Sequence, residues 1–329
     1  MKFRHVEEIL HDNTFLELEN FTSGRNIYLK LEGYNPGGSI KMKTAYALIY
    51  AAEEKNDLKN KKKFIESSSG NLGVALSIIS ASKGYKFTCV VDVNTSRQCI
   101  ETMRALNTSV VIIDTQDEQG GYLSNRFAYI RNAIGLDSDL IWLNQYENFA
   151  NPEAHYKLTA KAIFEEFDQV DYLFVGTGTA GTLMGCAEFI RRHSLQTKLI
   201  AVDSEGSVTF GTPGYRRYLP GLGASVMPHF FNRNGLDRLI QIPEVETVAA
   251  CRDSARRFGN FCGASTGTVL AAVKSISAEF PPDAVVVAIS PDLGNTYVDT
   301  VYSDTWCDHT FGPTWRTHLH TFRETLNDA

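Results

Sequence analysis

Hydrophobic and polar positions along this chain form short apolar runs that alternate with longer segments of helical pattern. The run at 285–289 is wholly apolar, which is typical of a strand buried on both faces of a sheet. Segments such as 72–83 and 181–192 follow apolar runs and have the pattern of helices. Strands that alternate with helices predict parallel sheets with helices on both faces, and therefore an α/β fold.

The same pattern predicts individual elements along the whole chain. Strands are expected at 26–31, 63–65, 87–91, 110–113, 141–143, 172–175, 199–202 and 284–289. Helices are expected at 42–54, 72–83, 97–106, 152–167, 181–192, 245–258 and 266–279. The segment 204–238 is rich in Gly and Pro and weakly patterned, as functional or mobile segments often are. The tail after Trp306 is expected to be a poorly ordered extension.

Composition narrows the class of protein. The chain has 329 residues, enough for about two domains, with 43% hydrophobic and 21% charged residues. Its net charge of -6 and lack of a long basic run argue weakly against nucleic acid or a membrane surface as partner. The six cysteines form no C-x-x-C pair, and no apolar run reaches membrane-spanning length. The N-terminal segment has acidic residues where a signal peptide needs an apolar core. These features predict a cytoplasmic protein with reduced thiols.

The first candidate for chemistry is Lys41. The string Asn-Pro-Gly-Gly-Ser-Ile-Lys at 35–41 places it behind a turn, at the start of a predicted helix. The positive end of the helix dipole disfavours a charged amine, and a neutral amine is what a lysine needs to form a Schiff base. For such a string alone, a solvated lysine after a turn is the better interpretation.

Three further loops each join a predicted strand to a predicted helix, where ligands bind in open α/β folds. Segment 66–73, Glu-Ser-Ser-Ser-Gly-Asn-Leu-Gly, suits a substrate carboxylate as well as it suits a serine-rich helix cap. Segment 176–182, Gly-Thr-Gly-Thr-Ala-Gly-Thr, favours a phosphate site, although it is no Walker A sequence. Segment 263–268 indicates first of all a capped helix start.

Other signals are weaker or missing. The polar string Asn-Gln-Tyr at 144–146 follows a predicted strand, and His155 alone indicates a structural or surface histidine. There is no G-x-S-x-G elbow and no H-E-x-x-H, and the histidines show no metal-ligand spacing, so no metal site is expected.

Taken in order, these loops resemble the fold-type II pyridoxal-phosphate enzymes, the family of cysteine synthase and cystathionine β-synthase. The resemblance runs from Asn13 to about Trp306. It includes 220–224, similar to the family's Gly-x-Gly-Ala loop, and 291–297, similar to its Pro-x-x-Gly-x-x-Tyr segment. It implies a tryptophan synthase β-like fold with two domains, each with a twisted, mostly parallel sheet flanked by helices. A mobile substrate-binding domain at 41–149 and a larger cofactor-phosphate-binding domain formed by 1–40 with 150–329 are expected.

The resemblance also implies roles for individual residues. Lys41 would hold pyridoxal 5'-phosphate as a Schiff base, Asn71 would contact its phenolic oxygen, and Ser265 would face its pyridine nitrogen. The cofactor phosphate would be bound by Gly178, Thr179, Ala180, Gly181 and Thr182. The substrate carboxylate would be bound by Ser68, Ser69, Asn71 and Gln145. A neutral serine beside the ring nitrogen makes the ring a weaker electron sink, which suits β-elimination.

Departures from the cysteine synthase pattern point to a subfamily. Met-Lys-Thr after Lys41, Gly-Gly-Tyr-Leu at 120–123 followed by Arg126, and the strings at 203–211 and 302–306 are similar to N-(2-amino-2-carboxyethyl)-L-glutamate synthases. These enzymes make a 2,3-diaminopropionate precursor for siderophores and antibiotics from O-phospho-L-serine and L-glutamate, through an aminoacrylate. Arg126, Arg216 and Arg217 are the candidates for binding phosphate or carboxylate, although for Arg217 a surface position is favoured.

Three alternatives stay open: a cysteine synthase that uses sulfide, a cystathionine β-synthase-like enzyme, and a non-catalytic scaffold with the same fold. The expected partners are small amino-acid substrates and a second copy of the chain in a homodimer.

Overall fold

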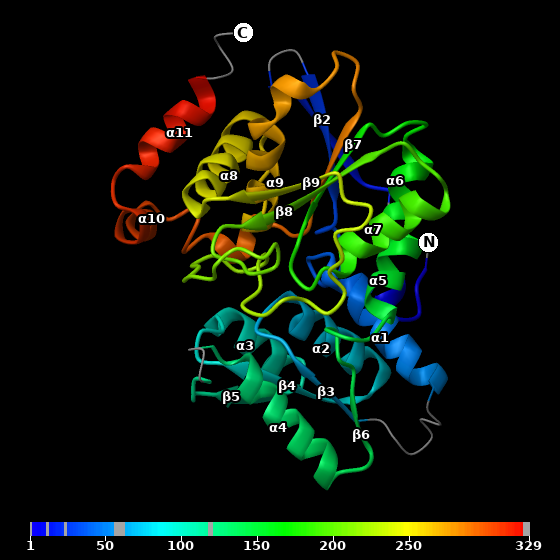
Figure 1. Cartoon of the computed structure of the whole chain (residues 1–329). Coiled ribbons are helices and arrows are strands. Elements are labelled where there is room, and N and C mark those ends of the chain that lie inside the picture. The colour runs from blue at the N-terminus through cyan, green and yellow to red at the C-terminus, as the bar shows by residue number, and fades with distance from the viewer. Residues whose placement is uncertain (1, 11–12, 23–24, 56–62, 118–120, 325–329) are drawn as a thin grey trace. The chain divides into compact units, whose positions relative to one another are not determined.

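The computed structural model describes residues 2–10, 13–22, 25–55, 63–117 and 121–324. The chain divides into two compact units (Figure 1). Unit 1 comprises Met1–His11 and Asn35–Ala154, and unit 2 comprises Asp12–Tyr34 and His155–Ala329. The boundaries expected from the sequence differ from this division in 1–11, 35–40 and 150–154, which belong to unit 1.

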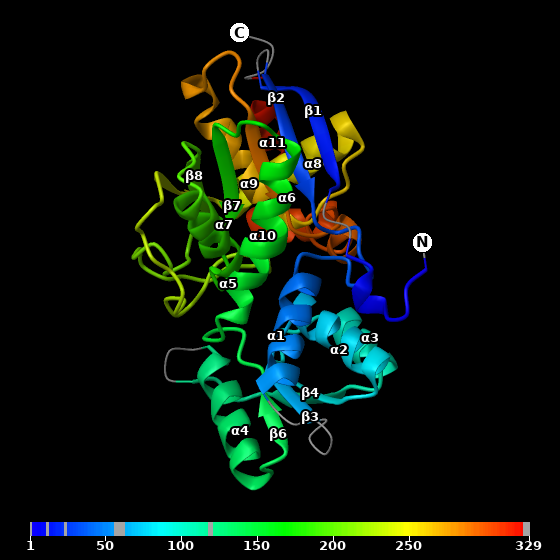
Figure 2. The ribbon, with the colours of Figure 1, turned by 90° about the vertical axis from the view of Figure 1, so that its right-hand side faces the viewer.

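Unit 1 contains a wholly parallel sheet with the strand order β5-β4-β3-β6. The strands are β3 (Lys63–Ser67), β4 (Lys86–Asp92), β5 (Ser109–Ile113) and β6 (Leu140–Trp142). The helices are η1 (Val6–Glu8), α1 (Lys41–Lys55), α2 (Asn71–Lys83), α3 (Arg97–Ala105), α4 (Leu123–Leu136) and α5 (Ala150–Ala154). Figures 1 and 2 show α1 and α2 on one face of the sheet and α4 on the other.

The two faces of this sheet bury different side chains. Phe64 and Phe87 pack with Leu76 of α2 on one face, and Ile65 and Val90 pack with Ile130 of α4 on the other. Strands covered on both faces are apolar at successive positions, which is why short apolar runs predicted them.

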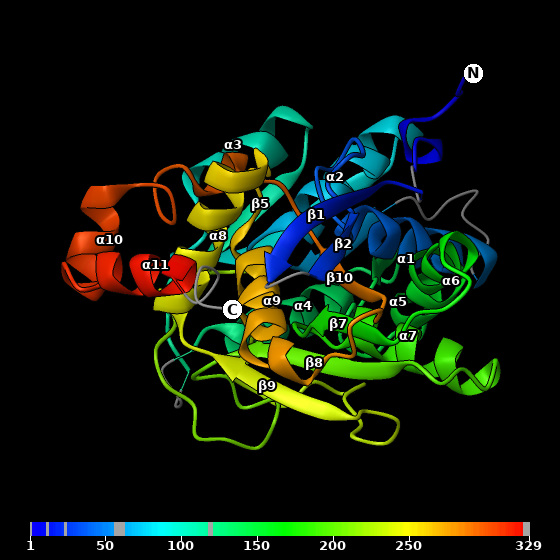
Figure 3. The same ribbon diagram turned by 90° about the horizontal axis from the view of Figure 1, so that it is seen from above.

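Unit 2 contains a six-stranded sheet with the order β1-β2-β10-β7-β8-β9, in which only the β1–β2 pair is antiparallel (Figure 3). The strands are β1 (Phe15–Thr22), β2 (Arg25–Leu31), β7 (Tyr172–Gly176), β8 (Lys198–Ser204), β9 (Arg238–Ile242) and β10 (Val286–Ser290). Figure 1 shows α8 and α9 on one side of this sheet and α6 and α7 on the other.

The helical elements of unit 2 complete the layers. They are η2 (His155–Ala160), α6 (Lys161–Glu166), α7 (Gly181–Arg192), α8 (Glu244–Phe258), α9 (Ala264–Ser275), η3 (Ser277–Glu279), η4 (Gly294–Tyr297), α10 (Asp304–Phe311) and α11 (Trp315–Glu324). The helix expected at 152–167 is therefore not regular, because its middle, His155–Ala160, is a π-helix. The helix expected at 266–279 ends early and continues as the short η3.

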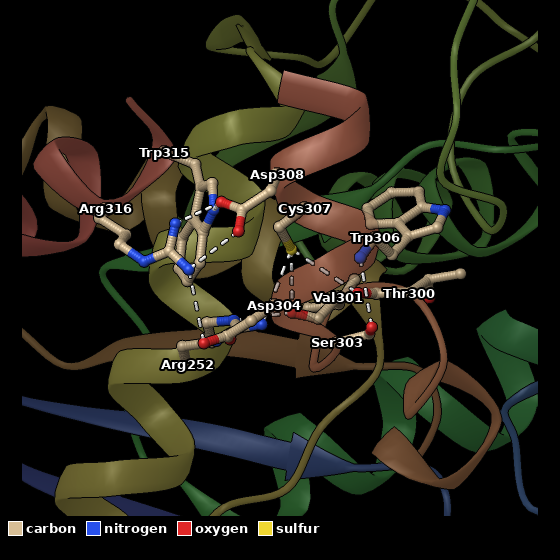
Figure 4. Close-up of polar contacts among 10 residues, drawn as sticks. All are labelled: Arg252, Thr300, Val301, Ser303, Asp304, Trp306, Cys307, Asp308, Trp315 and Arg316. Atoms are coloured by element: carbon tan, nitrogen blue, oxygen red, sulfur yellow. Dashed lines mark hydrogen bonds and ion pairs between the residues drawn. The ribbon is translucent and has the colours of Figure 1, made fainter. Parts of the chain in front are cut away.

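The sequence-based interpretation of the tail is wrong. After Trp306 the chain completes α10 and forms α11, which packs on α8. The indole of Trp315 is 2% exposed, and the guanidinium groups of Arg252 and Arg316 lie 4.3 Å and 4.5 Å from its ring centroid (Figure 4). Arg252 also donates to the Val301 carbonyl and pairs with Asp304. Cation–π and ionic contacts thus hold the tail against the body of unit 2.

The Gly- and Pro-rich segment 204–238 joins β8 to β9 and forms no helix or strand between them. Hydrogen bonds nevertheless fix its conformation. Ser207 Oγ accepts from the N–H of Ala224 at 2.9 Å, and Val208 N–H donates to the Ala224 carbonyl at 3.0 Å. Arg217 Nη1 donates to the Leu222 carbonyl at 3.1 Å. The loop at 220–224 is thereby fixed within unit 2.

Candidate active site

Lys41 is the first residue of α1, and the turn before it is held by its own side chains. Asn35 accepts from the N–H of Gly37 at 3.0 Å and donates to the Ser39 carbonyl at 2.9 Å. Gly38 has a φ of +65°, in the left-handed region that favours glycine. The buried Ser39 hydroxyl accepts from the Lys41 N–H at 3.3 Å, as a cap does. The backbone therefore holds the Lys41 side chain at a fixed helix start.

Ser68, expected to bind a substrate carboxylate, is a cap of α2. Its hydroxyl accepts from the N–H groups of Gly73 at 3.0 Å and Gly70 at 3.4 Å. A hydroxyl that accepts from the backbone still has one hydrogen to donate. Asn71 begins α2, and α2 packs against α1.

Ser69 is held by two charged side chains of unit 1. Its hydroxyl donates to Asp92 Oδ2 at 3.0 Å and accepts from Arg126 Nη1 at 2.5 Å. Arg126 and Asp92 are themselves 3.5 Å apart, and each side chain is 10% exposed. Asp92 ends β4, while Arg126 comes from the first turns of α4. The structure thus places Arg126 at the serine loop, away from open solvent.

Glu66, at the start of the serine loop, is a buried acid to which the sequence interpretation assigned no role. Its carboxylate is wholly buried and accepts from the N–H of Ser67 at 2.7 Å and from that of Gln145 at 3.1 Å. The Trp142 indole donates to it at 3.4 Å. Burial raises the pKa of Glu66 to about 7, against the opposing effect of these donors. Gln145 in turn donates to the Ser67 carbonyl at 2.9 Å, so Glu66 and Gln145 together join the ends of β3 and β6.

In unit 2, the loop at 177–180 joins β7 to α7 and has the geometry of an anion site. Ala180 has a φ of +65°, a conformation that turns successive N–H groups toward one side. A Cβ on Gly178 would lie 3.2 Å from the Gly221 carbonyl, so the loop is narrow there. Among the described residues, the buried Thr177 hydroxyl has no hydrogen-bond partner. The first N–H groups of α7 also lack partners within the helix. These features fit a phosphate group.

The segment Gly178, Thr179, Ala180, Gly181 and Thr182 was expected to form this loop, and His155 contacts its last residue. His155 is wholly buried, and its Nε2 lies 3.3 Å from Thr182 Oγ1. Its Nδ1 lies 3.1 Å from Thr159 Oγ1. The histidine thus joins η2 to the threonine hydroxyl at the start of α7.

Ser265 lies in the first turn of α9 and is 3% exposed. Its hydroxyl donates to Asp292 Oδ1 at 3.2 Å, and the Tyr297 hydroxyl donates to Asp292 Oδ2 at 2.9 Å. A Cβ on Gly221 would lie 3.5 Å from Ser265 Cβ, so Gly221 lies between Ser265 and the loop of Gly178. Unit 2 thus brings the expected phosphate loop and Ser265 to the same place.

The remaining arginine candidates lie elsewhere in unit 2. Arg216 is exposed and its guanidinium lies over the Tyr218 ring. Arg217 was expected at the surface, but its side chain packs on the loop at 220–224. The packing is so close that a Cβ on Gly223 would collide with the Arg217 guanidinium. Gly120, part of the string similar to the subfamily, lies outside the described residues.

The described part of the chain contains no group of three or more His, Cys, Asp or Glu side chains that could hold a metal ion. None of its helices combines the length and the apolar character that crossing a membrane requires.

The whole chain is similar to known pyridoxal-phosphate enzymes. The family described as PALP, pyridoxal-phosphate dependent enzyme, matches residues 8–292. The crystal structure of O-ureido-L-serine synthase is 26% identical with a TM-score of 0.85, over 93% of this chain and 98% of that one. The O-acetylserine dependent cystathionine beta-synthase of Helicobacter pylori is 26% identical with a TM-score of 0.82, over 92% and 100%. O-acetyl serine sulfhydrylase isoform 3 of Entamoeba histolytica is 25% identical with a TM-score of 0.85, over 98% and 96%.

These matches confirm three expectations from the sequence: the α/β fold of type II, the enzyme class and the dependence on pyridoxal phosphate. They extend over both units, since the matched residues include Lys41, the serine loop, the glycine-threonine loop and Ser265. The chain belongs to the family of pyridoxal-phosphate-dependent enzymes.

Proposed function

We propose that the chain is a transferase that replaces the β-substituent of O-phospho-L-serine with the amine of L-glutamate. The products are N-(2-amino-2-carboxyethyl)-L-glutamate and phosphate. The Cβ–O bond of phosphoserine breaks and a Cβ–N bond forms, so the atoms balance without an oxidant or reductant. The product would be a precursor of 2,3-diaminopropionate for siderophores or antibiotics, made by a cytoplasmic homodimer.

The proposal assigns cofactor-binding roles to the residues that the family resemblance implies. Lys41 would hold pyridoxal phosphate covalently, Asn71 would contact it, and Ser265 would face its ring nitrogen. The loop of 178–182 would bind its phosphate, as its left-handed Ala180 and free helix N–H groups favour. When bound, the cofactor supplies an electron sink that acidifies the α-hydrogen of the substrate.

The residues of unit 1 would carry the substrate chemistry. Ser68, Ser69, Asn71 and Gln145 would bind the substrate carboxylate. Lys41, once displaced by the substrate amine, would take the α-proton as a neutral base and later return it to the α-carbon. The fixed start of α1 supports this role, because it keeps the lysine at one position before and after displacement.

The observation that carries the choice of substrates is the buried Arg126 beside Ser69. A phosphate leaving group and a dicarboxylate nucleophile both need a cation, whereas sulfide does not. The Nε of Arg126 is buried and has no acceptor among the described residues, so they leave part of the hydrogen-bonding capacity of this guanidinium unused. Asp92, 3.5 Å away, neutralises part of its charge until an anion arrives.

The enzyme loaded with cofactor should release phosphate from O-phospho-L-serine and form the glutamate adduct, as detected by mass spectrometry. Arg126→Gln should raise the KM for phosphoserine or glutamate about 10- to 100-fold, the loss of one charged hydrogen bond. Arg131→Gln, an exposed change on the same helix, is the control.

The same assay separates the alternatives. Turnover with O-acetylserine and sulfide, but not with glutamate, would instead assign a cysteine synthase, the activity named for the Entamoeba relative. If homocysteine is the only nucleophile that reacts with the serine derivative, the activity would be cystathionine synthesis. An enzyme that binds cofactor but consumes no serine derivative would be a non-catalytic scaffold.

A further inference from the structure

Asn151 joins two parts of unit 1 that the proposed reaction uses, the helix that begins at Lys41 and the residue Gln145. It is the second residue of α5, a short helix that packs against α1 (Figures 1 and 2). Its side chain is wholly buried. Buried polar groups in folded proteins keep hydrogen-bond partners, so the contacts of this amide are part of the fold.

The oxygen of the amide contacts α1. Asn151 Oδ1 accepts from the Thr44 hydroxyl at 3.3 Å. Thr44 is also wholly buried, and it lies three positions after Lys41 in α1. Residues three apart lie on the same face of a helix, so this bond holds α1 one turn after the lysine.

The nitrogen of the amide contacts Gln145. Asn151 Nδ2 donates to the Gln145 carbonyl at 2.8 Å. The N–H of Gln145 donates to Glu66 at 3.1 Å, and its side-chain amide donates to the Ser67 carbonyl at 2.9 Å. Gln145 is therefore held by Asn151 at its carbonyl and by the end of β3 at two further groups. A side-chain NH2 group has two hydrogens, so one remains beyond the bond to Ser67.

This chain of bonds matters because Lys41 and Gln145 would act on one substrate molecule. In the proposed reaction Gln145 binds the substrate carboxylate, and Lys41 takes the proton from the neighbouring carbon. Proton transfer needs the base within hydrogen-bond reach of that proton, and a misplacement of about 1 Å can lower the rate about 100-fold. A buried link between α1 and Gln145 would keep the two groups at one separation.

We propose that Asn151 is a positioning residue that keeps Lys41 and Gln145 in register. It acts on α1 through the Thr44 hydroxyl and on Gln145 through the backbone carbonyl. The inference rests on the proposed function for the roles of Lys41 and Gln145. Asn151 itself need not touch the cofactor or the substrate to act in this way.

Amide hydrogen exchange on the full chain, before any substrate is added, tests the link itself. Asn151→Ala should speed exchange in the peptide 143–147 about tenfold, because the Gln145 carbonyl loses its donor. The matched control is Thr108→Val, which removes another buried hydroxyl of unit 1 that donates to Ser77 at 2.7 Å. Exchange in the peptide 143–147 should be unchanged in this control.

Kinetics of the holoenzyme with O-phospho-L-serine test the effect on the reaction. Asn151→Ala should raise the KM about 3- to 10-fold, as expected for a lost hydrogen bond. It should also lower kcat about tenfold and produce a primary isotope effect with substrate deuterated at the α-carbon, because a misplaced base makes proton removal limit the rate. Thr44→Val should act in the same direction, whereas Thr44→Ser keeps the hydroxyl and should restore the unaltered values. Thr44→Val combined with Asn151→Ala should add nothing beyond Asn151→Ala.

Kinetics of Asn151→Ala equal to those of the unaltered enzyme, with or without faster exchange, would overturn the inference. Equal changes in Thr108→Val would overturn it too, since they would reflect only the stability of unit 1. An unaltered enzyme that releases no phosphate would instead contradict the proposed function, and the exchange measurement would still decide whether Asn151 holds Gln145. If Asn151→Ala fails to fold, the comparison of Thr44→Val with Thr44→Ser decides.

Discussion

Glu66 gives a prediction that the stability of the protein depends on pH in a particular way. Its carboxylate is wholly buried at the end of β3, and burial raises its pKa from 4.5 to about 7. Between these two values the folded chain keeps the proton while the unfolded chain releases it. Stability therefore falls as pH rises from about 4.5 to 7, and it stays at the lower level above that.

The magnitude follows from the shift. A rise from 4.5 to about 7 corresponds to a loss of about 3 kcal/mol in the free energy of unfolding across this range. Glu66→Gln removes the titration. The N–H groups of Ser67 and Gln145 now donate to the Glu66 carboxylate. In the variant, the amide nitrogen of the glutamine side chain would face one of these N–H groups. That mismatch should cost about 1–3 kcal/mol at every pH.

Urea unfolding at pH 5, 6, 7 and 8 would measure the effect. The free energy of unfolding of Glu66→Gln, relative to the unaltered protein, should rise by about 3 kcal/mol from pH 5 to pH 8. Glu165→Gln, a change at an exposed position on α6, is the control for the loss of a surface carboxylate. A constant difference for Glu66→Gln would refute the reasoning, since it would mean that the buried carboxyl does not titrate in this range.

Two further variants test the contacts described above. Trp315→Ala should lower the free energy of unfolding of unit 2 by about 3–5 kcal/mol, because it deletes a buried indole in contact with Arg252 and Arg316; urea unfolding that matches the unaltered protein would contradict this. Ser68→Ala should cost about 1 kcal/mol as a lost helix cap, measured in the apoprotein where no substrate contributes, and an unchanged midpoint would show that Ser68 Oγ is not a cap.

The loops of the site could be predicted from the sequence because each is a local feature. A buried strand, a stretch of small residues and a helix start follow one another at 172–192, and no distant contact is needed to recognise them. The same holds for Lys41, whose turn is closed by Asn35 only a few positions earlier. That these loops bind the cofactor and the substrate stays a prediction.

Contacts between distant segments could not be predicted. Asp92 and Arg126 meet at Ser69 only because β4 and α4 pack beside β3, and nothing in the sequence pairs them. Asp292 lies in a segment noted only for its resemblance to the family, and its hydrogen bond with Ser265 appears only in the structure.

Some elements were missed although a signal existed. The apolar spacing of Trp315, Leu319 and Phe322 is that of one helix face, and these side chains are buried in the core of unit 2. Strand β1 alternates between apolar and charged residues and lies at the edge of its sheet, so it lacks the apolar run of the central strands. Helix α4 buries little beyond Arg126 and Ile130, so its apolar stripe is thin.

The central claim is that Lys41 carries the cofactor of a transferase, and one measurement tests it most directly. The holoenzyme is reduced with borohydride, digested and sequenced by mass spectrometry, in parallel with Lys41→Ala and Lys43→Ala. Lys43, two positions on and 1% exposed, is the matched control. We predict a pyridoxyl group on Lys41 in the unaltered protein and in Lys43→Ala, and none in Lys41→Ala. A pyridoxyl group on Lys43, or one that survives Lys41→Ala, would contradict the account.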